Sequence, residues 1–384
     1  MKPSKAAFIS VLKPIQDVRL FHKLALSWLE YGFEIHCFGF GSVAEASKNY
    51  EKAYFYTIFR QSRLHWSRVL VGFRLLWYLL KIRPEMLVCG AVEALPFCLF
   101  YKLLSFLCFR KVYLCYDIQE NYAANILFTQ SYPKNLRKIL AKFTRLCEWC
   151  CSWWVDMFFL AEKCYVEELP FLSGRFLVLE NKFLQKDTNP PQPTAELVLH
   201  FLHTGTLAKE YGIEKVIDFI QYCRNQAKGY HFSIVGKCSQ RETLKKLQSL
   251  ESEDVSLCIS LSPLAYKDIL AAYKQGSIVL MPYQINEAYK NRIPTKFYEA
   301  MAHNTWIWVQ ENPAWRLFFE EYGYKKVVFT DFWQEPINFE IISKNDFLRD
   351  FSFDNPNIFW EKEKEKIFLW LQKLNFLSKS SKKS

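Results

Sequence analysis

The amino-acid sequence predicts an α/β protein made of two domains, each built on a parallel β-sheet. The chain has 384 residues, more than a single hydrophobic core usually serves, and 51% of them are hydrophobic. Short apolar segments alternate with longer amphipathic segments, and this series runs through the chain twice. A stretch with three prolines and no apolar periodicity, residues 186–196, separates the two series. We interpret it as the linker between the domains.

The first series, residues 1–185, predicts the N-terminal domain. Apolar segments of strand length lie at 6–12, 33–39, 86–90, 112–117, 156–161 and 175–181. Residues 17–32 have apolar side chains at helical spacing and end in a glycine, which is typical of an amphipathic helix. Strands that alternate with helices in this way pair in parallel and are covered on both faces, so we expect a Rossmann-like domain.

The second series, residues 197–355, predicts a second Rossmann-like domain. Its strand candidates lie at 197–205, 231–237, 255–261, 277–283 and 305–311, with helix candidates between them. The last segment, residues 356–384, is expected to form an amphipathic helix that crosses back to the first domain, followed by a basic tail. Neither domain carries a GxGxxG motif after its first strand, which argues against a dinucleotide site of that type.

Composition indicates the compartment and the kind of partner. The formal net charge of +11 favours anionic partners such as phosphates, an acidic membrane or nucleic acid. The N-terminus does not resemble a secretory signal peptide, so we expect a cytoplasmic protein whose twelve cysteines are reduced. Cys147 and Cys150 form a CxxC pair without a second pair at metal-binding spacing, which favours core or helix-face positions.

Two segments combine aromatic, apolar and basic residues. Residues 69–83 carry Arg74 in their middle, and residues 96–111 carry Lys102. Neither reaches the roughly 18 apolar residues that suggest a membrane-spanning helix. One interpretation is a helix packed on the sheet. The other is a face that also lies on an anionic membrane at the inner side of the cell, where Trp, Phe and basic residues suit the interface.

The stretch NRIPTKFYEAMAHN, residues 291–304, is the strongest candidate for a ligand site. Pro294 suits the first position of a helix, where free backbone N–H groups favour an anion. Lys296 adds a full positive charge, and Glu299 lies one turn further on nearly the same face. A carboxylate there can accept hydrogen bonds from the two hydroxyls of a ribose. The alternative is a capped helix with a Lys–Glu surface pair.

Further polar and glycine residues follow other strands of the second domain. Because the carboxyl ends of parallel strands meet at one edge of a sheet, we expect these residues to converge with the helix at 294. Glycines allow the backbone to approach a ligand, and lysine or threonine side chains can bind phosphate. The predicted donor-binding residues are Gly205, Thr206, Lys209, Gly236, Lys237, Glu287, Asn291, Thr295, Lys296 and Glu299.

Several stretches carry a resemblance to a known family. In the second domain they are HTGTLAKEYGIEKVIDF, FSIVGK, YKDILAAYKQGSIVLMPY and NRIPTKFYEAMAHNTWIWV, and in the first DVRLFHKLALSWLEYGFEIHCFG, YDIQENYAANI and AEKCYVEELPF. Their order and spacing resemble the GT-B glycosyltransferases, specifically the family 4-like group of bacterial surface-polysaccharide type. The resemblance implies two Rossmann-like domains facing a central cleft, with the donor bound by the second domain and the acceptor by the first.

The resemblance also implies an activity. A sugar passes from a nucleotide-diphosphate sugar to a hydroxyl of a glycan or lipid-linked acceptor, with retention of configuration and without a metal ion. It makes Glu299 the ribose ligand. The chain departs from the family pattern at Asn291, where a glutamate is usual, and at Thr206 and Tyr211, where basic residues are usual. Lys209 and Lys296 are expected to compensate.

In the first domain, the stretch YDIQEN supplies the candidates for proton transfer. Asp117, Glu120 and Asn291 are the predicted catalytic residues, and Gln119 replaces a histidine of the family pattern. The alternative is that Asp117 and Glu120 cap a helix. Asp17, Arg19 and Asn121 are predicted on the acceptor side, with Asp17 as a helix N-cap in the alternative. His203, at a strand end, is the histidine of most interest.

Two other functions compete with glycosyl transfer. A non-catalytic GT-B protein that binds a nucleotide sugar, or scaffolds a membrane assembly, is favoured by Asn291, Thr206 and Gln119 in place of the family residues. A nucleic-acid binder is favoured by charge alone, and the aromatic residues lie in apolar periodic segments rather than along a basic stripe. We therefore predict no nucleic-acid partner.

Overall fold

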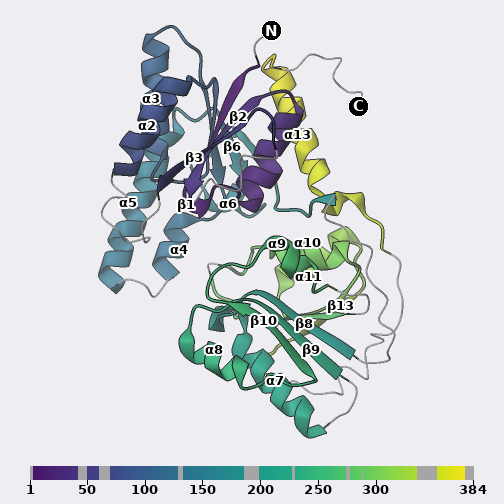
Figure 1. Ribbon diagram of the computed structural model, residues 1–384. Coiled ribbons are helices and arrows are strands. Elements are labelled where there is room, and N and C mark those ends of the chain that lie inside the picture. The colour runs from purple at the N-terminus through teal and green to yellow at the C-terminus, as the bar shows by residue number, and fades with distance from the viewer. Residues whose placement is uncertain are drawn as a thin grey trace. The chain divides into compact units, whose positions relative to one another are not determined.

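The computed structural model describes residues 3–41, 50–59, 70–128, 133–185, 199–226, 230–273, 277–287, 289–334 and 353–376. The chain divides into two compact units. Unit 1 comprises Met1–Asn181 and Trp360–Ser384, and unit 2 comprises Lys182–Phe359. Each unit is an α/β structure around one sheet (Figure 1). The predicted linker, residues 186–196, lies outside the described residues.

Unit 1 is built on a seven-stranded parallel sheet with the order β3-β2-β1-β4-β5-β6-β7. Its strands are β1 (Lys5–Pro14), β2 (Glu34–Phe40), β3 (Ala53–Phe59), β4 (Met86–Cys89), β5 (Tyr113–Ile118), β6 (Met157–Leu160) and β7 (Phe176–Val178). Six of these strands were predicted, and β3, at the edge of the sheet, was not. The strand order reverses between β1 and β4, as it does in doubly wound folds.

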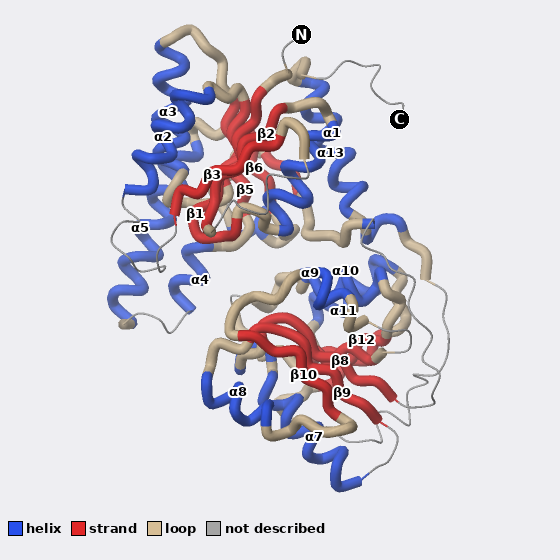
Figure 2. Tube along the Cα trace, viewed as in Figure 1, coloured by secondary structure: helices blue, strands red, loops and turns tan. Residues whose placement is uncertain are grey.

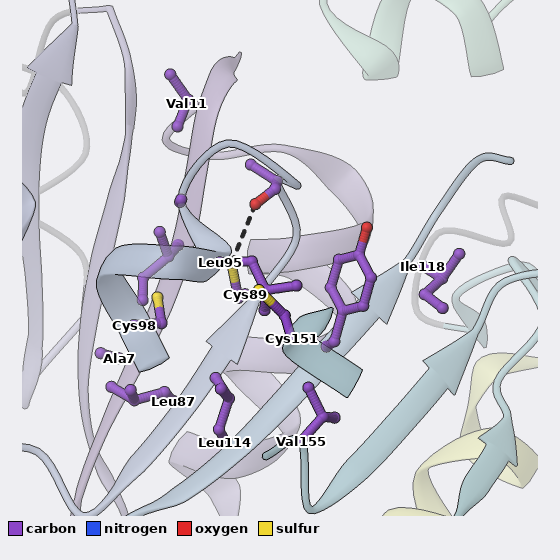
Figure 3. Packing of buried hydrophobic residues seen from close by; sticks show 14 of the residues in the cluster. Ala7, Val11, Leu87, Cys89, Leu95, Cys98, Leu114, Ile118, Cys151 and Val155 are labelled. Carbon is purple, nitrogen blue, oxygen red and sulfur yellow. Dashed lines mark hydrogen bonds between the residues drawn. The ribbon is translucent and has the colours of Figure 1, made fainter. Parts of the chain in front are cut away.

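Helices cover both faces of this sheet (Figure 2). Alternate residues of β1 point to opposite faces, so Ile9 joins one core while Phe8 packs on Trp28 with ring centroids 5.5 Å apart. Figure 3 shows the first core, where the thiols of Cys89 and Cys98 lie among leucines. The helices of this unit are η1 (Val18–Ala25), α1 (Leu26–Glu30), α2 (Val71–Ile82), α3 (Leu95–Leu107), α4 (Tyr122–Phe128), α5 (Lys134–Ser152), α6 (Tyr165–Glu168) and α13 (Trp360–Lys373).

The predicted helix at 17–32 is not a single α-helix. It begins as the π-helical stretch η1 and continues as α1. The last helix, α13, packs on this part of unit 1. Trp360 Nε1 donates a hydrogen bond to Ser27 Oγ (3.0 Å), and Lys366 Nζ donates to the carbonyl of Val178 (2.9 Å). Helix α13 therefore belongs to unit 1 and completes its core.

Unit 2 is built on a six-stranded parallel sheet with the order β10-β9-β8-β11-β12-β13. Its strands are β8 (Leu199–Thr206), β9 (Tyr230–Lys237), β10 (Val255–Ser260), β11 (Ile278–Met281), β12 (Trp306–Gln310) and β13 (Val327–Thr330). Its helices are η5 (Lys209–Tyr211), α7 (Ile213–Gln226), α8 (Arg241–Gln248), α9 (Tyr266–Leu270), α10 (Thr295–Ala302), α11 (Pro313–Tyr322) and η6 (Pro356–Ile358). β13 and α11 were not predicted.

The twelve cysteines form no disulfide. Cys147 and Cys150 lie on α5, in agreement with the predicted helix-face positions. Among the described helices, none combines the length and the apolar character that crossing a bilayer requires.

Candidate functional site

The carboxyl ends of β8 and β9 form the base of the candidate site in unit 2. Gly205 lies opposite Gly236, and Thr206 lies opposite Lys237. A Cβ on Gly236 would stand 1.9 Å from the carbonyl oxygen of Gly205, so this position has no room for a side chain. The two glycines thus allow β8 and β9 to pack closely at the edge where parallel sheets bind ligands.

Lys296, on α10, extends across this glycine. A Cβ on Gly205 would stand 2.7 Å from Lys296 Cε and 2.9 Å from Nζ. The φ angle of Gly205 is +93°, which also favours glycine. Lys296 Nζ donates a hydrogen bond to the carbonyl of Thr204, and it lies 5.4 Å from the ring centroid of Tyr283. The structure therefore brings two predicted site residues, Gly205 and Lys296, into contact.

The charge of Lys296 is poorly compensated. Burial of the ammonium group lowers the pKa of Lys296 to about 8, and the negative charge of Glu299 offsets only part of this effect. A lysine in such surroundings gains when an anion approaches, because the anion favours its charged form. The site is therefore electrostatically suited to a phosphate group.

Glu299 lies one turn after Lys296 and is buried. Its Oε1 accepts a hydrogen bond from the hydroxyl of Tyr266 (3.2 Å), and its Oε2 accepts one from Tyr273 (3.0 Å). We did not predict either tyrosine, although their spacing of seven residues places them on one face of a helical segment. A carboxylate has about four lone-pair positions, so the two tyrosines leave acceptor capacity for the hydroxyls of a ligand.

The start of α10 differs by one residue from the prediction. The helix begins at Thr295, and Pro294 occupies the cap position with φ −58° and ψ 133°. No side chain caps this helix, and its first turn contains no acidic residue. The N–H of Phe297 donates to the carbonyl of Pro294 (2.9 Å), so the N–H groups of Thr295 and Lys296 are the ones available to an anion.

Five other predicted donor-binding residues are exposed at or near this edge. Gln284 N donates to the carbonyl of Glu210 (3.0 Å), so the loop after β8 lies against the loop after β11. Lys209 pairs with Glu214 (3.7 Å) on the surface. The five residues are Thr206, Lys209, Glu287, Asn291 and Thr295.

His203 lies beneath the sheet edge rather than at its surface. It is 1% exposed, and its Nδ1 donates to the carbonyl of Leu280 (2.9 Å). Burial and the charge of Lys296 lower the pKa of His203 to about 3. Its Nε2 has no hydrogen-bond partner in the described part of the chain. The imidazole is therefore neutral near pH 7, which does not suit a proton shuttle.

In unit 1, Asp117 forms a buried ion pair with Arg19. Arg19 Nη2 lies 2.6 Å from Asp117 Oδ1, and Arg19 Nε lies 3.0 Å from Oδ1 and 3.1 Å from Oδ2. Arg19 Nη1 donates a hydrogen bond to the carbonyl of Leu179 (2.7 Å). Asp117 is fully buried and caps no helix, so the alternative of Asp117 as a cap is wrong. This geometry favours a structural role over proton transfer.

Gln119 extends the same network. Its amide nitrogen donates to Asp117 Oδ2 (2.8 Å), and its amide oxygen accepts from Lys13. A Cβ on Gly90 would stand 2.7 Å from this amide nitrogen. Gln119 thus links the charged side chains of Lys13 and Asp117.

The remaining residues predicted in unit 1 have assigned partners. Asp17 is the N-cap of η1, because its carboxylate accepts from the backbone N–H groups of residues 19 and 20 (3.1 and 3.0 Å). Asn121 caps the start of α4 through Ala124 N (3.3 Å) and accepts from Arg145 (2.6 Å). Glu120 is half-buried and accepts from Asn125 (2.6 Å). Asn121, rather than Glu120, is therefore the cap.

No cluster of three or more His, Cys, Asp or Glu side chains in the described part of the chain is arranged to hold a metal ion.

Comparison with known proteins identifies the fold. No family model matches the sequence, and no curated protein sequence matches it. Solved structures of GT-B proteins align with almost the whole chain, and the chain has the GT-B fold of two α/β units with parallel sheets.

Three solved structures illustrate this likeness. The sucrose-phosphate synthase of Thermosynechococcus elongatus is 10% identical, with a TM-score of 0.63 over 97% of this chain and 99% of that chain. HepE of Anabaena, in complex with UDP and glucose, is 11% identical, with a TM-score of 0.61 over 96% and 99%. The catalytic domain of starch synthase IV of Arabidopsis thaliana, bound to ADP and acarbose, is 10% identical, with a TM-score of 0.60 over 97% and 98%.

Proposed function

We propose that the chain is a glycosyltransferase that moves a hexose from a nucleotide-diphosphate sugar to a hydroxyl of an acceptor. The observation that carries this proposal is the position of Lys296 across Gly205, at the carboxyl edge of a parallel sheet. The lysine charge and the N-terminus of α10 together suit a diphosphate. The neighbours support it, since the HepE structure holds UDP and glucose and the starch synthase structure holds ADP.

The remaining groups of this edge would bind the rest of the donor. Glu299, held by two tyrosine hydroxyls, would accept hydrogen bonds from a ribose. Thr206, Lys237 and Asn291 would contact the phosphates or the sugar. Asn291 is neutral, so it would position a sugar hydroxyl rather than stabilise a charge.

Charge stabilisation would supply most of the catalysis. Negative charge grows on the diphosphate as the glycosidic bond breaks, and Lys296 with the N-terminus of α10 would stabilise it without a metal ion. We propose retention of configuration, with the acceptor attacking the face that the diphosphate leaves. Glu120 is the half-buried carboxylate that we propose for proton transfer, because Asp117 is fully paired.

The acceptor that we propose is a glycan or a lipid-linked saccharide, handled in the cytoplasm during assembly of a surface polysaccharide. The basic and aromatic helices of unit 1 support a membrane-proximal acceptor. This part of the proposal depends on the family resemblance of the sequence and on the fold.

The donor site is tested by thermal unfolding of the full chain with UDP-, GDP-, ADP- and TDP-sugars. A ligand at a hundred times its dissociation constant should stabilise the protein by about 2.7 kcal/mol. We expect one nucleotide class to stabilise the wild type and to lose this effect in Lys296→Ala and in Glu299→Ala. Lys245→Ala, on the surface of α8, is the matched control and should behave like the wild type. No stabilisation by any sugar nucleotide would contradict the proposal.

A non-catalytic GT-B protein is the second candidate. Asn291, Thr206 and Gln119, in place of the residues usual in the family, favour it. Such a protein is expected to bind a sugar nucleotide but not to transfer the sugar. Release of nucleoside diphosphate from the donor that stabilises the chain, in the presence of acceptor glycans, separates the two functions. Release that exceeds that of Lys296→Ala supports the enzyme, and binding without release supports the scaffold.

A further inference from the structure

Exposed apolar side chains are concentrated in one part of unit 1. Of the 25 large hydrophobic side chains that are exposed among the described residues, 18 lie between Leu70 and Trp154. Most of them belong to α2, α3 and α5, and α3 packs against both of the others (Figure 1). The surface of a globular domain seldom exposes so much contiguous apolar area without a binding role.

On α2, the exposed apolar side chains form one stripe. Leu70, Phe73, Trp77 and Leu80 follow one another at intervals of three and four residues, and each is at least 44% exposed. The opposite side of the helix, with Leu75 and Leu79, is fully buried in the core. The helix is therefore apolar on both the core side and the solvent side.

The same spacing recurs on α5. Leu136, Ile139, Phe143 and Leu146 are exposed at intervals of three and four residues, and Trp153 continues the line just beyond the helix. Phe143 is 67% exposed and Trp153 is 69% exposed. The core side of α5 is formed by other residues, among them Ala141, Glu148 and Cys151. Such a stripe is not explained by packing within the unit.

Helix α3 continues the apolar surface. Its residues Phe100, Leu103 and Phe106 are exposed, and Phe106 is 72% exposed. Because α3 packs against both α2 and α5, the three stripes belong to one layer of helices on one side of the unit 1 sheet (Figure 2). We call the exposed side of α2, α3 and α5 the aromatic face.

The exposed charged residues within α2, α3 and α5 are all basic. Arg74 and Lys81 flank the stripe of α2, with Lys81 Nζ 5.3 Å from the ring centroid of Trp77. Lys138 and Lys142 flank the stripe of α5 and are exposed. The single acidic residue in these three helices, Glu148, is buried and paired with Arg145 (3.0 Å).

We propose that the aromatic face docks on a lipid bilayer that contains anionic lipids. Apolar and aromatic side chains would enter the boundary between headgroups and acyl chains, and the flanking lysines and arginines would contact lipid phosphates. The inference does not depend on glycosyl transfer, because it rests on the surface of unit 1 alone. A chain docked in this way would lie at the membrane surface, where a lipid-linked acceptor is also found.

The charge distribution decides between a bilayer and a second copy of the chain. A symmetric dimer through this face would bring lysine and arginine side chains of both copies together, and the three helices offer no exposed acidic partner for them. A bilayer with anionic headgroups complements the same charges. The combination of aromatic stripes and flanking basic residues on neighbouring helices is typical of proteins that bind the membrane interface.

The test is co-sedimentation of the full chain with vesicles of phosphatidylcholine, alone or mixed with phosphatidylglycerol. The apolar variant combines Ile139→Ser and Phe143→Ser. Its matched control combines Leu261→Ser and Leu317→Ser in unit 2, because Leu261 (60%) and Leu317 (67%) are as exposed as Ile139 (63%) and Phe143 (67%). The charge variant combines Lys138→Gln and Lys142→Gln, and its control combines Lys245→Gln and Lys246→Gln on α8.

We expect the wild type to bind the mixed vesicles and to be released by salt. The charge variant should bind them about 30-fold more weakly, with little change on phosphatidylcholine. The apolar variant should bind both vesicle types at least about tenfold more weakly. The two control variants should behave like the wild type, and unchanged melting temperatures show that all of the variants are folded.

Two outcomes would overturn the inference. One is the absence of binding to mixed vesicles, or an equal loss in the control variants. The other is a stable dimer of the wild type in solution that the apolar variant dissociates, since the face would then belong to a second copy. Neither result bears on binding of nucleotide sugars, so the donor-site proposal is tested separately.

Discussion

Lys296 and Gly205 constrain each other directly. The lysine side chain passes so close to the glycine that a Cβ at position 205 would stand 2.7 Å from Cε and 2.9 Å from Nζ. The strand β8 and the helix α10 are thereby fixed at the point where a ligand of the sheet would bind. Each residue can be changed independently, which makes the contact open to experiment.

Replacing Gly205 should affect both stability and binding. We expect Gly205→Ala to destabilise the protein by about 1–3 kcal/mol, because the new methyl group requires both a positive φ and the displacement of Lys296. Denaturant unfolding measures this loss, and calorimetry measures donor affinity, which should also fall.

Gly323→Ala is the matched control for this substitution. Its φ is +68°, but nothing lies within 4 Å of the new Cβ, so it should cost about 1 kcal/mol and leave donor affinity unchanged. Equal effects of the two substitutions on donor affinity would contradict the proposed role of the contact.

Donor binding should weaken at alkaline pH. Lys296 has a pKa of about 8 in the folded chain, against 10.5 for an ordinary lysine. Between these two pH values the unfolded chain binds more protons than the folded chain. The cost of burying the charged lysine therefore decreases, and the free protein becomes more stable, as pH rises through that window. A diphosphate favours the protonated lysine, so its affinity should fall about tenfold per pH unit above pH 8.

Titration calorimetry between pH 7 and 10 measures this dependence. Lys296→Met should bind weakly and without the alkaline decline, and Lys245→Met should reproduce the wild type. An alkaline decline that persists in Lys296→Met would assign the titration to another group.

The ion pair between Arg19 and Asp117 should be important for folding. Arg19→Met leaves a buried carboxylate without its partner, so we expect a loss of about 3–5 kcal/mol in the free energy of unfolding. The exposed pair between Arg316 and Glu311 is the control, and Arg316→Met should cost less than about 1 kcal/mol. Denaturant unfolding compares the two, and similar losses would show that burial of the first pair is unimportant.

His203 should make the protein sensitive to mild acid. Its pKa of about 3 in the folded chain lies below the ordinary 6.5, so the unfolded chain binds more protons between these values. Stability from this residue is complete above pH 6.5 and decreases as pH falls, by about 2 kcal/mol at pH 5. Unfolding at pH 7 and 5 should show this loss in the wild type but not in His203→Gln. The control variant His231→Gln, at a half-buried position, should still lose stability between pH 7 and pH 5.

Much of the fold follows from the sequence because strand and helix patterns are local. Eleven apolar segments predicted as strands lie at strands of the structure, because each is an apolar run that can be recognised within a few residues. The strands β3 and β13 were missed, and both lie at the edges of the sheets.

The contacts of the candidate sites were less predictable. Arg19 and Asp117 are 98 residues apart, and the sequence offers no pattern that joins them. The position of Lys296 across Gly205 likewise depends on how α10 packs on the sheet. Tyr266 and Tyr273 did carry a local signal, since residues seven apart share a helical face.

The apolar stripe of α5 was missed for a related reason. Its apolar residues alternate with Lys138, Lys142 and other basic residues, so no long apolar run marks them. A periodic pattern on the helix predicts an apolar face, but only the structure shows that this face lies in solvent.

Titration calorimetry of the full chain with a nucleoside diphosphate, in the wild type and in Lys296→Met at pH 7, is the sharpest test of the donor site. We expect one molecule to bind per chain in the wild type, and a loss of affinity of about tenfold or more in Lys296→Met. Equal affinity in both proteins, or no binding to the wild type by any nucleoside diphosphate, would show that the edge formed by Gly205 and Lys296 is not the donor site.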